Sequence, residues 1–134
     1  MKILGIETSC DETGIALVEA SGGLKNPRFR VLKNLVASQI KIHAPFGGVV
    51  PNLAKREHEK NLPILLKRLL GCPTAKWDIV AVTVGPGLEP CLWQGIEFAK
   101  EVAKKFKKSV VAVNHMEGHI ASVLLGQEKQ EEIN

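Results

Sequence analysis

The chain has 134 residues, of which 45% are hydrophobic and 24% charged, and its formal net charge is +4. This length suits a single domain with a real hydrophobic core, and the composition excludes extensive disorder. No apolar run is long enough to span a membrane and the first residues do not resemble a signal peptide, so we expect a cytoplasmic protein.

Three strands are predicted in the first forty residues, at 2–8, 14–19 and 29–37, separated by polar or glycine-containing turns. The first two strands read as a hairpin. A long helix is predicted at about residues 51–70, where four leucines recur at helical spacing. Pro63 is placed to kink or divide this helix.

The rest of the chain alternates strands and helices. An apolar strand at 78–84 leads through a loop at 85–90 into a helix that presents one apolar face. A short strand at 109–113 precedes a last helix. The order βββαβαβα predicts an α/β domain with one mixed sheet, an antiparallel start and right-handed parallel crossovers. It is similar to the ribonuclease-H-like half-domain that occurs twice in actin and hexokinase.

The last helix carries His115 and His119, one turn apart and therefore on the same face. Asn114 is a good N-cap for it. Two imidazoles so placed can hold one metal ion, although at least one further ligand must come from elsewhere. Glu117 points away from the pair, which argues against a metalloprotease helix. The alternative is two partly exposed helix histidines.

Two loops could carry chemistry. Residues 7–13 join the first two strands, and their hydroxyls and amides can surround a phosphate, while Asp11 could hold magnesium through water. Ordinary turn formation explains the same residues. Residues 85–90 contain two glycines that permit close approach of a backbone or ligand. We interpret Cys91 as a packing residue and His58 as a helix-surface residue.

The chain has three cysteines, Cys10, Cys72 and Cys91. They lack any C-x-x-C spacing, which favours reduced thiols. Five lysines cluster near the end of the helix that follows residue 90. They could attract RNA phosphates, but a solvated helix face is the more economical interpretation. The cluster consists of Lys100, Lys104, Lys105, Lys107 and Lys108.

Four motifs in order resemble the TsaD/Gcp family, formerly called O-sialoglycoprotein endopeptidases. They are Ile-Glu-Thr-Ser-Cys-Asp-Glu-Thr at 6–13, Gly-Gly-Val-Val-Pro at 47–51, Gly-Pro-Gly-Leu at 85–88 and Asn-His-Met-Glu-Gly-His at 114–119. Residues 1–126 are similar to the family's amino-terminal half, an actin-like ATPase subdomain. Residues 127–134 form a polar tail that we expect to be cut short. Asn52 and Gln94 depart from the family's pattern.

The resemblance implies transfer of a threonylcarbamoyl group from its adenylate to an adenosine beside the tRNA anticodon. It implies one divalent metal ion, iron or zinc, on His115 and His119, completed by a ligand absent from this chain. It also implies ATP or threonylcarbamoyl-adenylate facing Ser9, Cys10, Asp11 and Thr13, with Asp11 and Ser9 as candidate catalytic residues.

Partners implied by the resemblance are tRNA, TsaB-like or KEOPS-type proteins and the missing carboxy-terminal half, and a homodimer is an open possibility. We expect the isolated chain to be inactive because it holds about half of an active site. The alternative function is a non-catalytic TsaB-like scaffold, and a metalloprotease is a weaker one.

Overall fold

The computed structural model describes residues 1–125 and 131–132. The strands are β1 (Lys2–Glu7), β2 (Glu12–Ser21), β3 (Arg28–Ser38), β4 (Ile79–Gly85), β5 (Ser109–Asn114) and β6 (Glu131–Glu132). The helices are α1 (Ile40–His43), the 3-10 helix η1 (Ala44–Phe46), α2 (Pro51–Leu70), α3 (Glu89–Phe106) and α4 (His115–Ser122). The predicted order βββαβαβα is confirmed, with α1, η1 and β6 as short additions. Apart from β6, the predicted tail at 127–134 lies outside the described residues.

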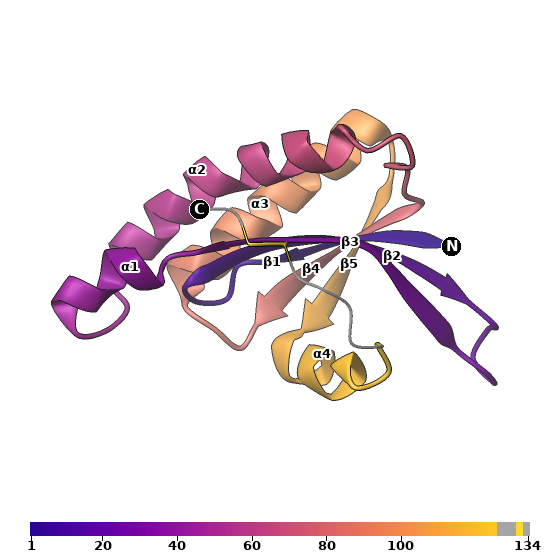
Figure 1. Cartoon of the computed structure of the whole chain (residues 1–134), viewed down its shortest axis with the longest axis horizontal. Coiled ribbons are helices and arrows are strands. Elements are labelled where there is room, and N and C mark those ends of the chain that lie inside the picture. Colours follow the sequence, from indigo (N-terminus) through magenta and orange to yellow (C-terminus); the bar gives the residue numbers. More distant parts are fainter. Residues whose placement is uncertain (126–130, 133–134) are drawn as a thin grey trace.

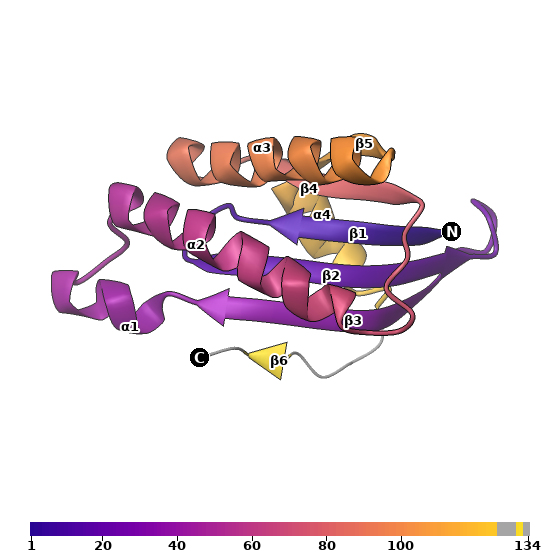
Figure 2. The same ribbon diagram turned by 90° about the horizontal axis from the view of Figure 1, so that it is seen from above.

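The strands form one mixed sheet in the order β5-β4-β1-β2-β3-β6 (Figure 2). Strand β1 pairs antiparallel with β2 and parallel with β4, and β4 pairs parallel with β5. This is the predicted hairpin followed by parallel crossovers. As a result, the carboxyl ends of β1, β4 and β5 all lie at one edge of the sheet.

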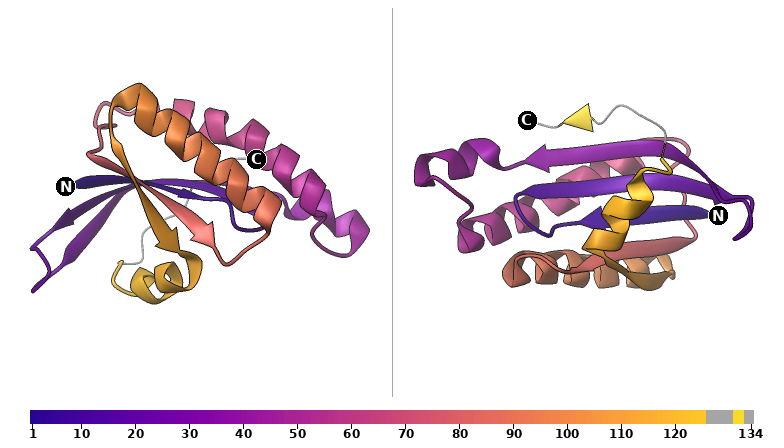
Figure 3. Two further views of the ribbon diagram at one scale, coloured as in Figure 1. Left: turned by 180° about the vertical axis from the view of Figure 1, so that it is seen from behind. Right: turned by 90° about the horizontal axis from the view of Figure 1, so that it is seen from below.

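Helices α2 and α3 cover one face of the sheet, and α4 lies on the other (Figures 1 and 3). The core fills the space between the sheet and helices α2 and α3. Every second strand residue points to this face of the sheet, and the leucines of α2 recur at helical spacing and so face it. Pro63 lies inside α2 without dividing it, since Leu62, Leu65 and Leu69 on either side remain packed in the core. The expected division of the helix is therefore wrong.

The α4 side of the sheet carries small residues, among them Gly5, Ala16 and Ala81, and α4 covers it incompletely. A pocket of about 390 Å³ remains beneath α4. Four apolar side chains of α4 and the turn after it are exposed, and we call them the α4 apolar surface. They are Met116, Ile120, Val123 and Leu124, with exposed fractions of 55%, 73%, 81% and 59%. No helix in the described part of the chain is long and apolar enough to cross a membrane.

Candidate functional site

Residues from three of the four sequence motifs meet at the edge where β1, β4 and β5 end. The loop after β1 holds Ser9, the loop after β4 holds Gly87, and α4 begins directly after β5 with His115. In open α/β sheets, ligands bind outside the carboxyl ends of the strands, near the point where the chain turns to opposite sides. The edge is therefore the candidate functional site.

The histidine pair is held by a short helix that starts as the sequence predicts. The Asn114 side chain caps α4 by accepting hydrogen bonds from the backbone N–H groups of Met116 and Glu117, at 2.9 and 3.2 Å. The rings of His115 and His119 then pack edge to face, with Nε2 of each 2.9 Å from Nε2 of the other. The two nitrogens therefore converge on one point beside the helix.

Glu7, at the end of β1, links this pair to the first loop. Its carboxylate accepts hydrogen bonds from the Ser9 backbone N–H and the Thr83 hydroxyl, each at 2.5 Å, and lies 3.4 Å from Nδ1 of His115. Burial alone would raise the pKa of Glu7, but the hydrogen bonds from Ser9, Thr83 and His115 outweigh it and lower the pKa. Glu7 is therefore an ionised carboxylate at neutral pH. Sequence reasoning passed over it, although its place at a strand end before a turn was a usable signal.

The loops after β1 and β4 are packed tightly together. The Leu88 N–H donates to the Ser9 carbonyl at 2.8 Å, and the Thr8 hydroxyl donates to the Cys91 carbonyl at 2.8 Å. A Cβ added at Gly87 would lie 2.7 Å from the Ser9 carbonyl oxygen, so this approach requires glycine. The predicted close approach at this glycine loop is made by the protein's own first loop.

Three of the four residues expected to face a nucleotide, Ser9, Cys10 and Thr13, differ in their surroundings. Ser9 is 6% exposed and its hydroxyl lies 3.2 Å from Nδ1 of His115. Cys10 is exposed as a whole residue. The pKa of its thiol is nevertheless raised, first by the partial loss of water around the thiol and then by the nearby Asp11 carboxylate. Thr13 is fully buried and bonds Nδ1 of His58 at 2.8 Å. Its hydroxyl is directed into the domain.

Three further predictions concerned Cys91, the lysine cluster and His58, and the structure agrees with the first two but not with the third. Cys91 is fully buried, which confirms its interpretation as a packing residue, and burial raises the pKa of its thiol to about 11. The five lysines of the cluster near the end of α3 are all exposed, as a solvated face requires. His58, however, is 0% exposed, so its assignment to the helix surface is wrong. It lies on the face of α2 that meets the first loop, where Cys10 and Thr13 satisfy its ring nitrogens.

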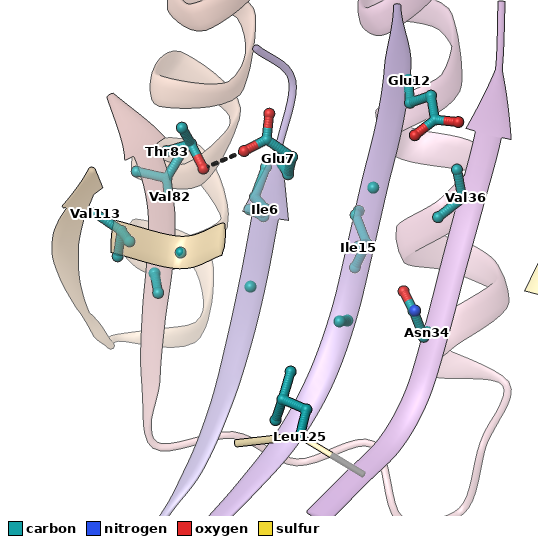
Figure 4. A pocket seen from close by; sticks show the side chains of 15 residues that line it. Ile6, Glu7, Glu12, Ile15, Asn34, Val36, Val82, Thr83, Val113 and Leu125 are labelled. Atoms are coloured by element: carbon teal, nitrogen blue, oxygen red, sulfur yellow. Dashed lines mark hydrogen bonds between the residues drawn. The ribbon is translucent and has the colours of Figure 1, made fainter. Parts of the chain in front are cut away.

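The pocket beneath α4 opens beside the same edge. Figure 4 shows Glu7, hydrogen-bonded to Thr83, and Glu12 toward one end of the pocket, and Leu125 at the other. Most of the lining between them is apolar. The pocket therefore offers an apolar floor next to a carboxylate.

The residues present fit a metal ion at the histidine pair. Two nitrogens that each lie about 2.0–2.1 Å from one tetrahedral zinc ion are about 3.3–3.4 Å apart, and the observed 2.9 Å is a few tenths of an ångström from this spacing. A metal-bound histidine usually donates its other ring N–H to a carboxylate or similar acceptor, and Nδ1 of His115 faces Glu7 and Ser9. Among the described residues, no group of three or more His, Cys, Asp or Glu side chains is placed to hold an ion.

Comparison with solved structures defines the class of protein first. YeaZ from Pseudomonas aeruginosa superimposes with a TM-score of 0.52 at 18% identity, over 91% of this chain and 48% of that one. A Thermus thermophilus RuvC structure gives 0.54 at 16% identity, over 96% of this chain and 71% of that one. These similarities show the fold, a ribonuclease-H-like α/β domain of the kind found in actin-like ATPases.

Comparison by sequence then gives the family. The family model described as TsaD: tRNA N6-adenosine threonylcarbamoyltransferase matches residues 30–132, and the chain belongs to this family. A relative of that name from Fervidobacterium nodosum is 50% identical over 125 residues, covering 91% of this chain. One from a strain of Thermus thermophilus is 48% identical over 125 residues, also covering 91% of this chain. The chain spans only 35% and 36% of the length of these two relatives.

Proposed function

We propose that the chain is the amino-terminal part of a tRNA N6-adenosine threonylcarbamoyltransferase. In this proposal it contributes the first loop and the histidine pair to an active site that the rest of the protein completes. The observation that carries the proposal is the convergence of the His115 and His119 nitrogens, braced by Glu7 and Ser9, at the strand edge of a domain from this family.

The metal ion, iron or zinc, would be held by Nε2 of His115 and Nε2 of His119, with a further ligand outside this chain. When bound, it would act as a Lewis acid that polarises a carbonyl group of the transferred threonylcarbamoyl moiety. The chain's own residues would orient it: the Glu7 carboxylate, 3.4 Å from Nδ1 of His115, would accept the Nδ1–H, fix the ring and leave Nε2 as the ligating nitrogen.

The nucleotide, ATP or threonylcarbamoyl-adenylate, would lie against the loop after β1. Ser9, Cys10 and Asp11 would face its phosphates, with Asp11 and Ser9 as candidate catalytic groups. Thr13 would act from behind the loop, because its hydroxyl is engaged with His58.

The partners we propose are the missing carboxy-terminal portion, tRNA and TsaB-like or KEOPS-type proteins, in the cytoplasm, with no membrane involved. The α4 apolar surface supports the first of these, since large exposed apolar patches mark interaction sites. Pairing of two copies through this surface is the alternative, and a non-catalytic scaffold that pairs in this way is the competing function.

The test is reconstitution. The chain is mixed with the complementary portion of a relative, its partner proteins, threonylcarbamoyl-adenylate and tRNA, and modified adenosine is measured by mass spectrometry. We expect transfer with the wild type and with Ile64→Ala, a control at an exposed position of α2 outside the site and the α4 apolar surface, but loss of transfer with His115→Ala/His119→Ala. A folded complex that forms but never transfers would favour the scaffold.

A further inference from the structure

A cluster of buried polar side chains lies behind the first loop, between β2, α1 and α2. It consists of Thr13, Gln39, His43 and His58, which are 0%, 0%, 3% and 0% exposed. Buried polar groups cost free energy unless they are hydrogen-bonded, and apolar side chains would fill the same space more cheaply. The cluster therefore points to a role beyond filling the core. We call it the His58 cluster.

The hydrogen bonds of His58 fix its tautomer. The Cys10 carbonyl, 2.9 Å from Nε2, can only accept, so Nε2 carries the proton and Nδ1 is an acceptor. Nδ1 accepts from the Thr13 hydroxyl at 2.8 Å and from the Gln39 amide at 3.5 Å. Burial lowers the pKa of His58, which keeps this neutral form at neutral pH although the Cys10 carbonyl, Glu7 and Asp11 favour protonation.

The remaining members of the His58 cluster hold Gln39 in one orientation. Nδ1 of His43 accepts from the Val50 N–H at 3.2 Å, so its Nε2–H donates to Oε1 of Gln39 at 2.8 Å. The amide nitrogen of Gln39 then donates to the Ala54 carbonyl at 3.3 Å as well as to His58. Each polar group in the chain of bonds has one consistent role, which makes the cluster rigid.

The His58 cluster holds the first loop by two carbonyl oxygens, and the loop after β4 holds a third. Three consecutive carbonyls are bonded from the body of the domain: that of Ser9 by the Leu88 N–H at 2.8 Å, that of Cys10 by His58 at 2.9 Å, and that of Asp11 by the Gln39 backbone N–H at 2.9 Å. The peptide bonds here are trans, so each following N–H points away from its carbonyl. The N–H groups of residues 10–12 therefore point away from the donors that hold the preceding carbonyls, and successive amides so placed can bind an anion.

We propose that His58 is a positioning residue, whose Nε2–H holds the Cys10 carbonyl inward so that the loop after β1 presents its amides to the phosphates of a nucleotide. The inference rests on the proposed function for the identity of that ligand. Among the three anchors of the loop, His58 is the only one supplied by a side chain, so it is the one that substitution can remove.

Two substitutions separate positioning from stability. His58→Gln places an amide donor near the position of Nε2 and can still reach the Cys10 carbonyl. His58→Asn has a shorter side chain that can satisfy Thr13 and Gln39 but not Cys10. Leu69→Val is the control, because Leu69 is buried in the apolar core on the same helix and forms no part of the His58 cluster. The free energy of unfolding of each variant is measured by urea titration, and only folded variants are compared.

The readouts are the ¹⁵N order parameters of residues 9–12 and the affinity for inorganic pyrophosphate. In the wild type, His58→Gln and Leu69→Val we expect order parameters near the rigid value of about 0.85, and in His58→Asn a fall toward about 0.6. Pyrophosphate affinity should fall about tenfold in His58→Asn alone, the equivalent of one lost hydrogen bond to the loop. Equal losses in His58→Gln and His58→Asn, or none in either, would overturn the role of His58.

Two further outcomes are distinguishable. A wild type that does not bind pyrophosphate overturns the assignment of the loop to a nucleotide, on which the inference rests. Long-range ¹H–¹⁵N correlation of the wild-type imidazoles needs no variant at all. It should show His58 as the neutral Nε2–H form, and an Nδ1–H form would overturn the inference because the Cys10 carbonyl would lose its donor.

Discussion

The contact between Thr8 and Gly95 sets the spacing between the first loop and α3, and Gly95→Ala should disrupt it. A Cβ at Gly95 would lie 2.4 Å from the Thr8 hydroxyl oxygen, and Thr8 is 0% exposed with that hydroxyl bonded to the Cys91 carbonyl. Overpacking costs about 1–3 kcal/mol, and a buried hydroxyl without a partner costs about 1–3 kcal/mol. Alanine gains about 1 kcal/mol over glycine inside a helix. The net destabilisation is therefore about 1–5 kcal/mol.

Urea unfolding followed by circular dichroism measures this change. Gly118→Ala in α4 is the matched control, because nothing lies within 4 Å of its added Cβ, and it should be neutral or stabilising by up to about 1 kcal/mol. Thr8→Ala/Gly95→Ala should be more stable than the sum of the single changes predicts, since the second substitution relieves the clash. A Gly95→Ala variant as stable as the wild type would refute the reasoning.

Three further predictions follow from burial. Leu62→Ala should destabilise the chain by about 2–5 kcal/mol in the same assay, because Leu62 is 1% exposed, whereas Ile120→Ala, at 73% exposure, should change it by less than about 0.5 kcal/mol. Cys91 should resist iodoacetamide at pH 8 until the chain is denatured, as peptide mass spectrometry would show; alkylation of the folded chain would contradict its raised pKa. The pKa of His58 in the folded chain lies below its ordinary value of 6.5, so the unfolded chain binds a proton more readily. The contribution of His58 to the free energy of unfolding should therefore be fully present above pH 6.5 and decline as the pH falls below it. Urea titrations between pH 5 and 7 should show a flatter decline in His58→Gln, and an unchanged slope would contradict this.

Much of the fold could be predicted because the local signals agree with the tertiary structure. The leucines of α2, the apolar run of β4 and the Asn114 cap each specify an element that the packing retains. Pro63 misled because its effect depends on packing that a sequence does not display. The short helix α1 was missed because four residues carry too little periodicity to be detected.

The convergence of the two histidines was predictable from the sequence, and the residues that support them were less so. The spacing of His115 and His119 and the Asn114 cap define a pair on one helix face whatever the surroundings. The roles of Glu7 and His58 depend instead on partners far away in the chain: Thr83 and His115 for the first, Cys10 and Thr13 for the second. His58 stands alone among charged residues of α2, and the sequence around it gives no sign that this face of the helix contacts a loop 48 residues earlier in the chain.

Metal affinity tests the proposed role of the histidine pair most directly. A zinc titration against a chromophoric chelator compares the wild-type chain, Met116→Ala and His115→Ala/His119→Ala. The first two should bind zinc alike, and the double variant should bind at least about tenfold more weakly, since even loss of a supporting partner costs that much. Equal zinc affinity in all three proteins would contradict the proposal that these imidazoles are the chain's metal ligands.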